Sequence, residues 1–225
     1  MNTPLQCASY RGHTNAMRLL LEHGAKVDIS NKYKMTPLHW ASSDGNIDGI
    51  YLLLEHGADV NEKDKNGWTP LHRASCYGQI NAMKLLIEHG ANVDEKDEYG
   101  ATSLYLTSRF NHTNAMRLLI NNGADVNEKD KDGYTPVHET SSNGNIDGMQ
   151  LLIDHGAKID EENCIGQTPL YGASFNGHIN AMKLLIEHGA NVNEKDRSGL
   201  TPLHYASFNS HTDAVQLLMA NGATK

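Results

Sequence analysis

The chain has 225 residues, 39% of them hydrophobic, and its 19 Lys and Arg against 27 Asp and Glu give a formal net charge of −8. This length and composition suit a folded protein with a buried core. An acidic chain without a long basic block lacks the electrostatic footprint that nucleic acid needs, so we expect no nucleic-acid partner.

The targeting signals and the cysteine content of the sequence indicate where the protein resides in the cell. No apolar run reaches the roughly 18 to 20 residues that a membrane helix needs, and the N-terminus lacks the basic-then-apolar layout of a signal peptide. The three cysteines, Cys7, Cys76 and Cys164, are too few and too scattered for a disulfide framework. We therefore expect no membrane association and a cytoplasmic location.

Two short motifs recur along the whole chain at a fixed interval of 33 residues. Thr-Pro-Leu or a near variant begins at Thr3, Thr36, Thr69, Thr102, Thr135, Thr168 and Thr201. Gly-Ala begins at Gly24, Gly57, Gly90, Gly123, Gly156, Gly189 and Gly222. Seven copies without an insertion or deletion indicate identical units stacked in a row, which is the pattern of a solenoid.

A second interval of 99 residues, three times the first, indicates how the chain arose. The segment NAMKLLIEHGAN from Asn81 to Asn92 returns letter for letter from Asn180 to Asn191. Duplication of a three-repeat block explains this identity. Such a copy is tolerated because repeats mainly contact their nearest neighbours.

Each copy predicts the same elements in the same order. In the third copy, Thr69 caps a short helix that begins at Pro70 and runs to about Tyr77. A second helix follows from about Asn81 to His89, carries a broad apolar face and is ended by a glycine, and an extended charged turn leads to the next copy. We expect one domain over residues 1–225, with repeats at about 1–30, 31–63, 64–96, 97–129, 130–162, 163–195 and 196–225.

The repeat resembles the ankyrin repeat family, whose pattern D-x-x-G-x-T-P-L-H-x-A is matched in this same copy by Asp64, Gly67, Thr69, Pro70, Leu71, His72 and Ala74. The resemblance covers essentially the whole chain. It implies an all-α fold, a solenoid of seven helix-turn-helix units with hairpin-like turns and a concave binding face. Lys34 stands where the next five copies have glycine, so that turn either gives up its left-handed geometry or accepts strain of roughly 1 kcal/mol.

The 13 histidines and three cysteines do not form a predicted catalytic or metal site. Equivalent histidines of adjacent repeats should lie about 8 to 10 Å apart, too far to share a zinc ion that needs each nitrogen at about 2.0 to 2.1 Å. The resemblance implies a structural role for the motif histidines His39, His72, His138 and His204. Cys76 has histidines in its general neighbourhood, but a catalytic thiol needs a base within hydrogen-bond reach and a pocket that excludes water, so we interpret this lone thiol as a contact or a bystander. We expect no catalytic residue, no cofactor and no metal, and so no enzyme.

The resemblance also implies where a protein or peptide partner would bind, namely at the turn tips and the inner face of the first helix of each repeat. Eleven of the 14 aromatic residues fall at such positions, and aromatic residues with arginine are typical of binding hot spots. The strongest predicted cluster lies in the groove of repeats two to five and consists of Trp40, Trp68, Arg73, Tyr77, Tyr99, Arg109, Phe110 and Tyr134. Alanine at Trp68 or Phe110 should weaken binding by roughly 2 kcal/mol or more with little change in thermal stability. The alternative is that these rings only pack on one another.

A structural or assembly element is the second predicted function. Terminal repeats of free-standing solenoids usually carry polar outer faces. Here the last repeat keeps Ala214, Val215, Leu217, Leu218 and Met219, and the first keeps Met17, Leu20 and Leu21. Uncovered ends of this kind would allow self-association or the docking of a neighbouring domain. The sequence does not identify the partner in either case.

Overall fold

The computed structural model describes residues 3–224, which contain fourteen α-helices and no β-strand. The chain divides into two compact units, one that ends at Ala124 and one that begins at Asp125. The prediction of an all-helical repeat fold is confirmed. One domain over residues 1–225 stays a prediction.

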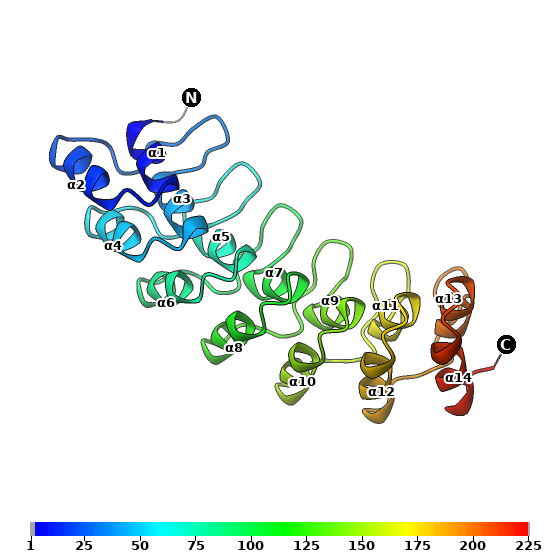
Figure 1. Ribbon diagram of the computed structural model, residues 1–225. Helices are drawn as coiled ribbons and strands as arrows, with labels where there is room; N and C mark the ends of the chain where they lie inside the picture. Colours follow the sequence, from blue (N-terminus) through cyan, green and yellow to red (C-terminus); the bar gives the residue numbers. More distant parts are fainter. Residues whose placement is uncertain (1–2, 225) are drawn as a thin grey trace. The chain divides into compact units, whose positions relative to one another are not determined.

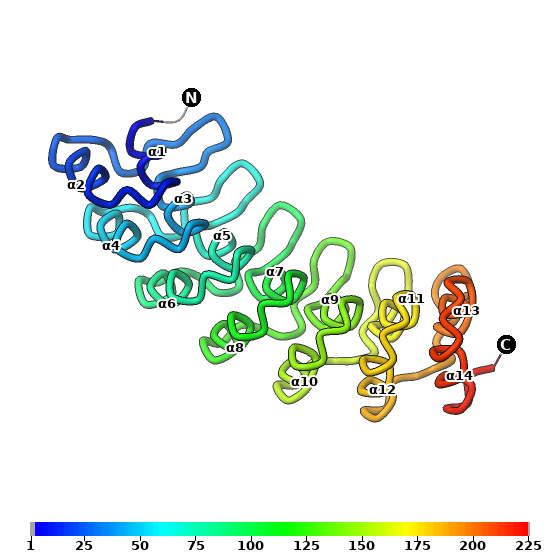
Figure 2. The backbone as a smooth tube through the Cα atoms, in the orientation of Figure 1, coloured from blue at the N-terminus to red at the C-terminus, as the bar shows by residue number. Residues whose placement is uncertain are grey.

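The first unit consists of four helix pairs. They are α1 (Pro4–Tyr10), α2 (Thr14–Glu22), α3 (Pro37–Asp44), α4 (Ile47–Glu55), α5 (Pro70–Cys76), α6 (Ile80–Glu88), α7 (Ser103–Arg109) and α8 (Thr113–Asn121). Helices α1, α3, α5 and α7 pack side by side in one row, and α2, α4, α6 and α8 form a second row (Figure 1). The loops that join one pair to the next extend beyond the first row (Figure 2).

The second unit consists of three helix pairs with the same arrangement. They are α9 (Pro136–Asn143), α10 (Ile146–Asp154), α11 (Pro169–Phe175), α12 (Ile179–Glu187), α13 (Pro202–Phe208) and α14 (Thr212–Ala220). Helix α11 packs between α9 and α13, and α12 packs between α10 and α14. Helices of seven to nine residues are too short to persist alone in water, so this stacking supplies their stability.

The Thr-Pro motif starts the first helix of most pairs, as α5 illustrates. The Thr69 hydroxyl accepts a hydrogen bond from the backbone N–H of His72, and His72 Nδ1 accepts one from the backbone N–H of Thr69. Pro70 occupies the first helical position, where its missing N–H costs nothing. Helices α5 and α6 begin and end within one residue of the predicted bounds.

The motif histidines also link successive repeats. Because Nδ1 accepts a backbone N–H, the ring proton is on Nε2, which donates to a carbonyl of the following repeat. These bonds join His39 to Trp68 at 2.9 Å, His72 to Ala101 at 3.2 Å and His138 to Gln167 at 3.1 Å. The predicted structural role of these three histidines is confirmed.

Two other residue types make the same link where the histidine is replaced. In the first repeat, Gln6 Oε1 accepts the backbone N–H of Thr3 and its amide donates to the Met35 carbonyl at 2.9 Å. In the sixth repeat, the Tyr171 hydroxyl lies within hydrogen-bond distance of the carbonyls of Glu194 and Leu200. The link is therefore a property of the position rather than of histidine.

Each hairpin-like turn is closed by an acidic or amide side chain. Asp64 Oδ1 accepts the backbone N–H groups of Asn66 at 2.8 Å and Trp68 at 3.0 Å. Gly67 has φ +77°, and a Cβ there would lie 2.8 Å from the backbone nitrogen of Glu98 in the next turn. Lys34 occupies the corresponding place with φ +57°, so this turn keeps the left-handed geometry and bears the strain.

Each unit has a buried apolar core to which both rows of helices contribute. Leu71, Met83 and Leu86 are fully buried in the first unit, as are Leu170 and Leu185 in the second. Residues at the chain ends take part in these cores. The exposed apolar surface in the first and last repeats is smaller than predicted, because Met17, Leu21, Ala214 and Leu218 are buried.

Candidate functional site

The predicted binding residues of the first unit lie on α3, α5, α7 and the turns beside them. We call this set the first-unit face, and it consists of Trp40, Trp68, Arg73, Tyr77, Tyr99, Arg109 and Phe110. Tyr77, Tyr99 and Phe110 are 57%, 67% and 45% exposed. Arg109 is also exposed, whereas Trp40, Trp68 and Arg73 are half-buried.

Trp68 and Arg73 form an ordered cluster with two buried carboxylates. The Arg73 guanidinium lies over the Trp68 ring, 4.6 Å from its centroid, and forms an ion pair with Asp64. The Trp68 indole donates a hydrogen bond to Asp97 at 2.9 Å. The expectation of little change in thermal stability for Trp68→Ala stays a prediction, although the substitution would remove this bond and uncover the ion pair.

The other members of the first-unit face make fewer internal contacts. The Trp40 ring meets the exposed Tyr10 edge to face, with centroids 5.0 Å apart. Phe110 follows α7 as its C-terminal cap, with its centroid 6.5 Å from that of His112. Tyr77 caps α5 in the same way. These rings present large apolar area at the ends of short helices.

Tyr134, the last residue of the predicted cluster, belongs to the second unit. It is half-buried there, and its ring meets His138 edge to face at 5.5 Å. Burial raises the pKa of its hydroxyl. Within the second unit, the residues near Tyr134 include other aromatic side chains.

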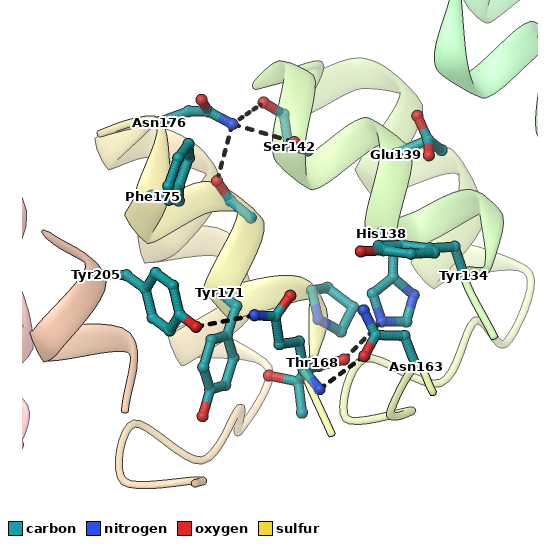
Figure 3. A pocket seen from close by; sticks show the side chains of 13 residues that line it. Tyr134, His138, Glu139, Ser142, Asn163, Thr168, Tyr171, Phe175, Asn176 and Tyr205 are labelled. Atoms are coloured by element: carbon teal, nitrogen blue, oxygen red, sulfur yellow. Dashed lines mark hydrogen bonds between the residues drawn. The ribbon is translucent and has the colours of Figure 1, made fainter. Parts of the chain in front are cut away.

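These neighbours line a cavity of about 270 Å³ among α9, α11 and α13 (Figure 3). We call it the second-unit pocket, and its aromatic walls are Tyr134, Tyr171, Phe175 and Tyr205. Tyr205 donates to Asp196 at 2.7 Å and accepts a hydrogen bond from the Gln167 amide at 3.1 Å. The second-unit pocket is thus a preformed hollow with ordered walls.

Reasoning from the sequence did not single out this pocket. Tyr171, which occupies the motif-histidine slot, is not among the eleven aromatic residues at the predicted binding positions. Gly172 is the signal that identifies it, since the matching positions of other repeats hold Trp40, Arg73, Leu106, Glu139 and Tyr205. A glycine inside a helix lowers its stability by about 1 kcal/mol relative to alanine, so a glycine at this position indicates a local structural constraint.

Burial shifts the pKa values of several titratable groups among the described residues. Burial lowers the pKa of His39 and His138 from 6.5 to about 4, which keeps both rings neutral near pH 7. Burial raises the pKa of the Cys76 thiol more than the charges of Arg73 and Arg109 lower it, which is the opposite of what a nucleophilic thiolate requires. Within residues 3–224, no group of three or more His, Cys, Asp or Glu is placed to hold a metal ion, and no helix is long and apolar enough to cross a bilayer.

Comparison with known proteins agrees with the geometry. A family model described as ankyrin repeats (3 copies) matches residues 1–64, 59–130, 91–163, 111–196 and 137–225. The crystal structure of the human ASB11 ankyrin repeat domain is similar with a TM-score of 0.90 and 26% sequence identity, over 100% of both chains. A search of curated protein sequences found no match. This chain belongs to the ankyrin repeat family.

Proposed function

We propose that this chain is a non-enzymatic module that binds a protein or peptide through the turn tips and first helices of repeats two to five. Ankyrin repeats are generally protein–protein interaction modules, and their stacked repeats offer extended binding surfaces. Most of the proposed surface is the first-unit face, and Tyr134 is the fifth-repeat residue in the second unit. The three free cysteines also support a cytoplasmic location.

The observation that carries this proposal is the exposure of large rings that the fold does not need. Tyr77, Tyr99 and Phe110 leave roughly half or more of their surface in solvent, whereas the repeated framework residues Leu71 and Leu104 are fully buried. Aromatic residues and arginine are enriched in binding hot spots, which typically cluster near the centre of an interface. The composition and exposure of the first-unit face fit that description.

The half-buried members give this surface a fixed shape. Trp68 and Arg73 are held by Asp64 and Asp97, so their exposed edges have one orientation before a partner arrives. Preorganised side chains lose less entropy on binding. We therefore assign Trp68 and Arg73 to the support of the surface, and the exposed rings to direct contact.

A capture experiment with matched variants tests the assignment. The wild-type chain, a Tyr77→Ala, Tyr99→Ala, Phe110→Ala variant and a Tyr51→Ala control are immobilised and exposed to lysate of the source organism. Tyr51 is 49% exposed on α4 in the other row, so its loss removes a similar ring from a different surface. Bound proteins are identified by mass spectrometry, and thermal melts check that all three chains are folded.

The proposal predicts a protein that wild type and Tyr51→Ala retain and the triple variant loses. Hot-spot residues cost about 2 kcal/mol or more each, so the triple variant should bind at least a thousandfold more weakly. Equal retention by the folded triple variant would contradict the assignment to the first-unit face.

Self-association through the terminal repeats is the second candidate. Leu19 on α2 and Met219 on α14 are exposed apolar residues in the first and last repeats, which favours it. Light scattering separates the two functions. A monomer at micromolar concentration contradicts self-association, whereas a dimer that Leu19→Ser or Met219→Ser dissociates supports it.

A further inference from the structure

One wall of the second-unit pocket contains a glycine, Gly172, at a position where the first helices of the other repeats carry a side chain. Gly172 lies in the middle of α11 and is one of the residues that line the hollow. Tyr134 lies on one side of the hollow, and Phe175 and Tyr205 lie on the other (Figure 3). The Tyr205 ring centroid is 5.3 Å from that of Tyr171 and 6.2 Å from that of Phe175, so these three rings form one continuous wall.

The duplicated block supplies an internal comparison for this pocket. Ninety-nine residues earlier, Arg73 occupies the position of Gly172 in the first unit. There the cation stacks on Trp68 and pairs with Asp64. In the second unit, Gln167 replaces the tryptophan. The chain thus supplies its own cation in one copy of the block and none in the other.

Three further replacements add aromatic rings around the hollow in the second copy of the block. Tyr134 replaces Met35, Phe175 replaces Cys76 and Tyr205 replaces Leu106. Each change adds a ring whose face attracts a cation. The loss of the arginine is therefore accompanied by a gain of groups that would bind a cation from outside.

The distribution of charge in the second unit also favours a cationic ligand. Among residues 3–224, no Lys or Arg lines the second-unit pocket. Glu139 replaces Trp40 on its α9 side, and the Asp196 carboxylate accepts a hydrogen bond from Tyr205. From residue 125 onward the sequence has 14 Asp and Glu against seven Lys and Arg, a net charge of −7, whereas residues 1–124 carry −1. This negative field attracts cationic ligands to the second unit.

We propose that the second-unit pocket binds a cationic side chain, an arginine or a lysine, of the protein partner. The aromatic faces of Tyr134, Phe175 and Tyr205 contact the charged group, and the negative charge around the pocket favours it over a neutral side chain. This inference rests on the proposed function in one respect, since it names the part of a partner that the second unit recognises.

A titration with small probes tests the pocket without a partner protein. N-acetyl-arginine methylamide, N-acetyl-lysine methylamide and the neutral isostere N-acetyl-citrulline methylamide are added to the 15N-labelled full chain, and amide chemical shifts are followed. We expect saturable shifts at residues that line the second-unit pocket with a cationic probe. Binding of the citrulline probe should be at least about fivefold weaker, because the attraction of the rings requires the charge. Equal binding of arginine and citrulline, or shifts confined to other regions, would overturn the proposal.

Variants that remove rings from the pocket or occupy the hollow locate the binding. Tyr134→Met with Phe175→Leu keeps apolar bulk but removes two rings, and it should weaken the arginine probe about fivefold or more, whereas Tyr51→Leu should not. Unchanged affinity in the double variant would overturn the proposal. Gly172→Arg should occupy the hollow with the chain's own cation and abolish binding.

The variants also separate this inference from the proposed function. A Cβ at position 172 would lie 3.1 Å from Ser142 Cβ, so Gly172→Arg is accepted as a test only if its thermal melt is near that of wild type. The Phe175 ring is about half exposed, and its replacement does not carry that risk. Probe binding needs no partner protein, so loss of partner capture and loss of probe binding are independent results.

Discussion

Acidification should destabilise the first unit through its buried motif histidines. Burial, the largest cause, lowers the pKa of His39 from 6.5 to about 4 and also lowers the pKa of His72. In the folded chain Nδ1 of each ring accepts a backbone N–H, so a second ring proton would break that bond. The unfolded chain takes up the proton below pH 6.5, but the folded chain takes it up at His39 only near pH 4.

The sign and size follow from this difference in proton uptake. The unfolded state binds more protons between pH 6.5 and 4, so the free energy of unfolding falls as the pH falls through this range. Between pH 6.5 and 5, above the range in which most carboxylates titrate, His39 alone should contribute a loss of about 2 kcal/mol. At a typical urea dependence this lowers the unfolding midpoint by about 1 M.

The chain contains the matched control for this effect. His39→Gln copies Gln6, which accepts the Thr3 N–H and donates to the next repeat without a titrating proton. Urea unfolding is followed at several pH values by tryptophan fluorescence, which reports the first unit because the two tryptophans are Trp40 and Trp68. The variant should lose about 2 kcal/mol less than wild type between pH 6.5 and 5. An equal loss in both chains would refute the reasoning.

Three further predictions concern the framework and are checked by urea unfolding. Lys34→Gly should stabilise the chain by about 1 kcal/mol, because glycine adopts the left-handed φ of +57° without strain. Gly67→Ala should destabilise it by about 2 kcal/mol or more, because the added Cβ meets Glu98 at 2.8 Å; a neutral result would contradict the turn geometry. Tyr171→Phe should cost about 1 kcal/mol by removing the hydroxyl that reaches the Leu200 carbonyl, and no cost would show that this link is dispensable.

The repeat made most of the fold predictable. Thr69, Pro70 and Gly78 mark where a helix starts and where it stops, and these local signals do not depend on distant residues. The 33-residue interval then fixes which residues become neighbours, because stacked repeats contact only adjacent copies. Even the strained turn at Lys34 follows from its position in the repeat.

The binding surfaces were predictable only in outline. Exposure of Tyr77 and Tyr99 follows from their places at a helix end and a turn tip. By contrast, the contact of Arg73 with Asp64 and Trp68 depends on rotamers that no interval determines. Gly172 lines the second-unit pocket where α11 lies close to Ser142 of α9, 3.1 Å from the position of an added Cβ. A repeat pattern draws attention to the positions that agree with it rather than to the one residue that departs from it.

Hydrogen–deuterium exchange on the complex with a captured partner locates the binding surface along the chain. We expect slower exchange at the turn tips near Asn66 and Tyr99 and at the C-terminal ends of α5 and α7, where Tyr77 and Phe110 lie. Exchange in α4, α6 and α8 should stay unchanged. Protection confined to these second-row helices, with none at the turn tips, would contradict the claim that the first-unit face binds the partner.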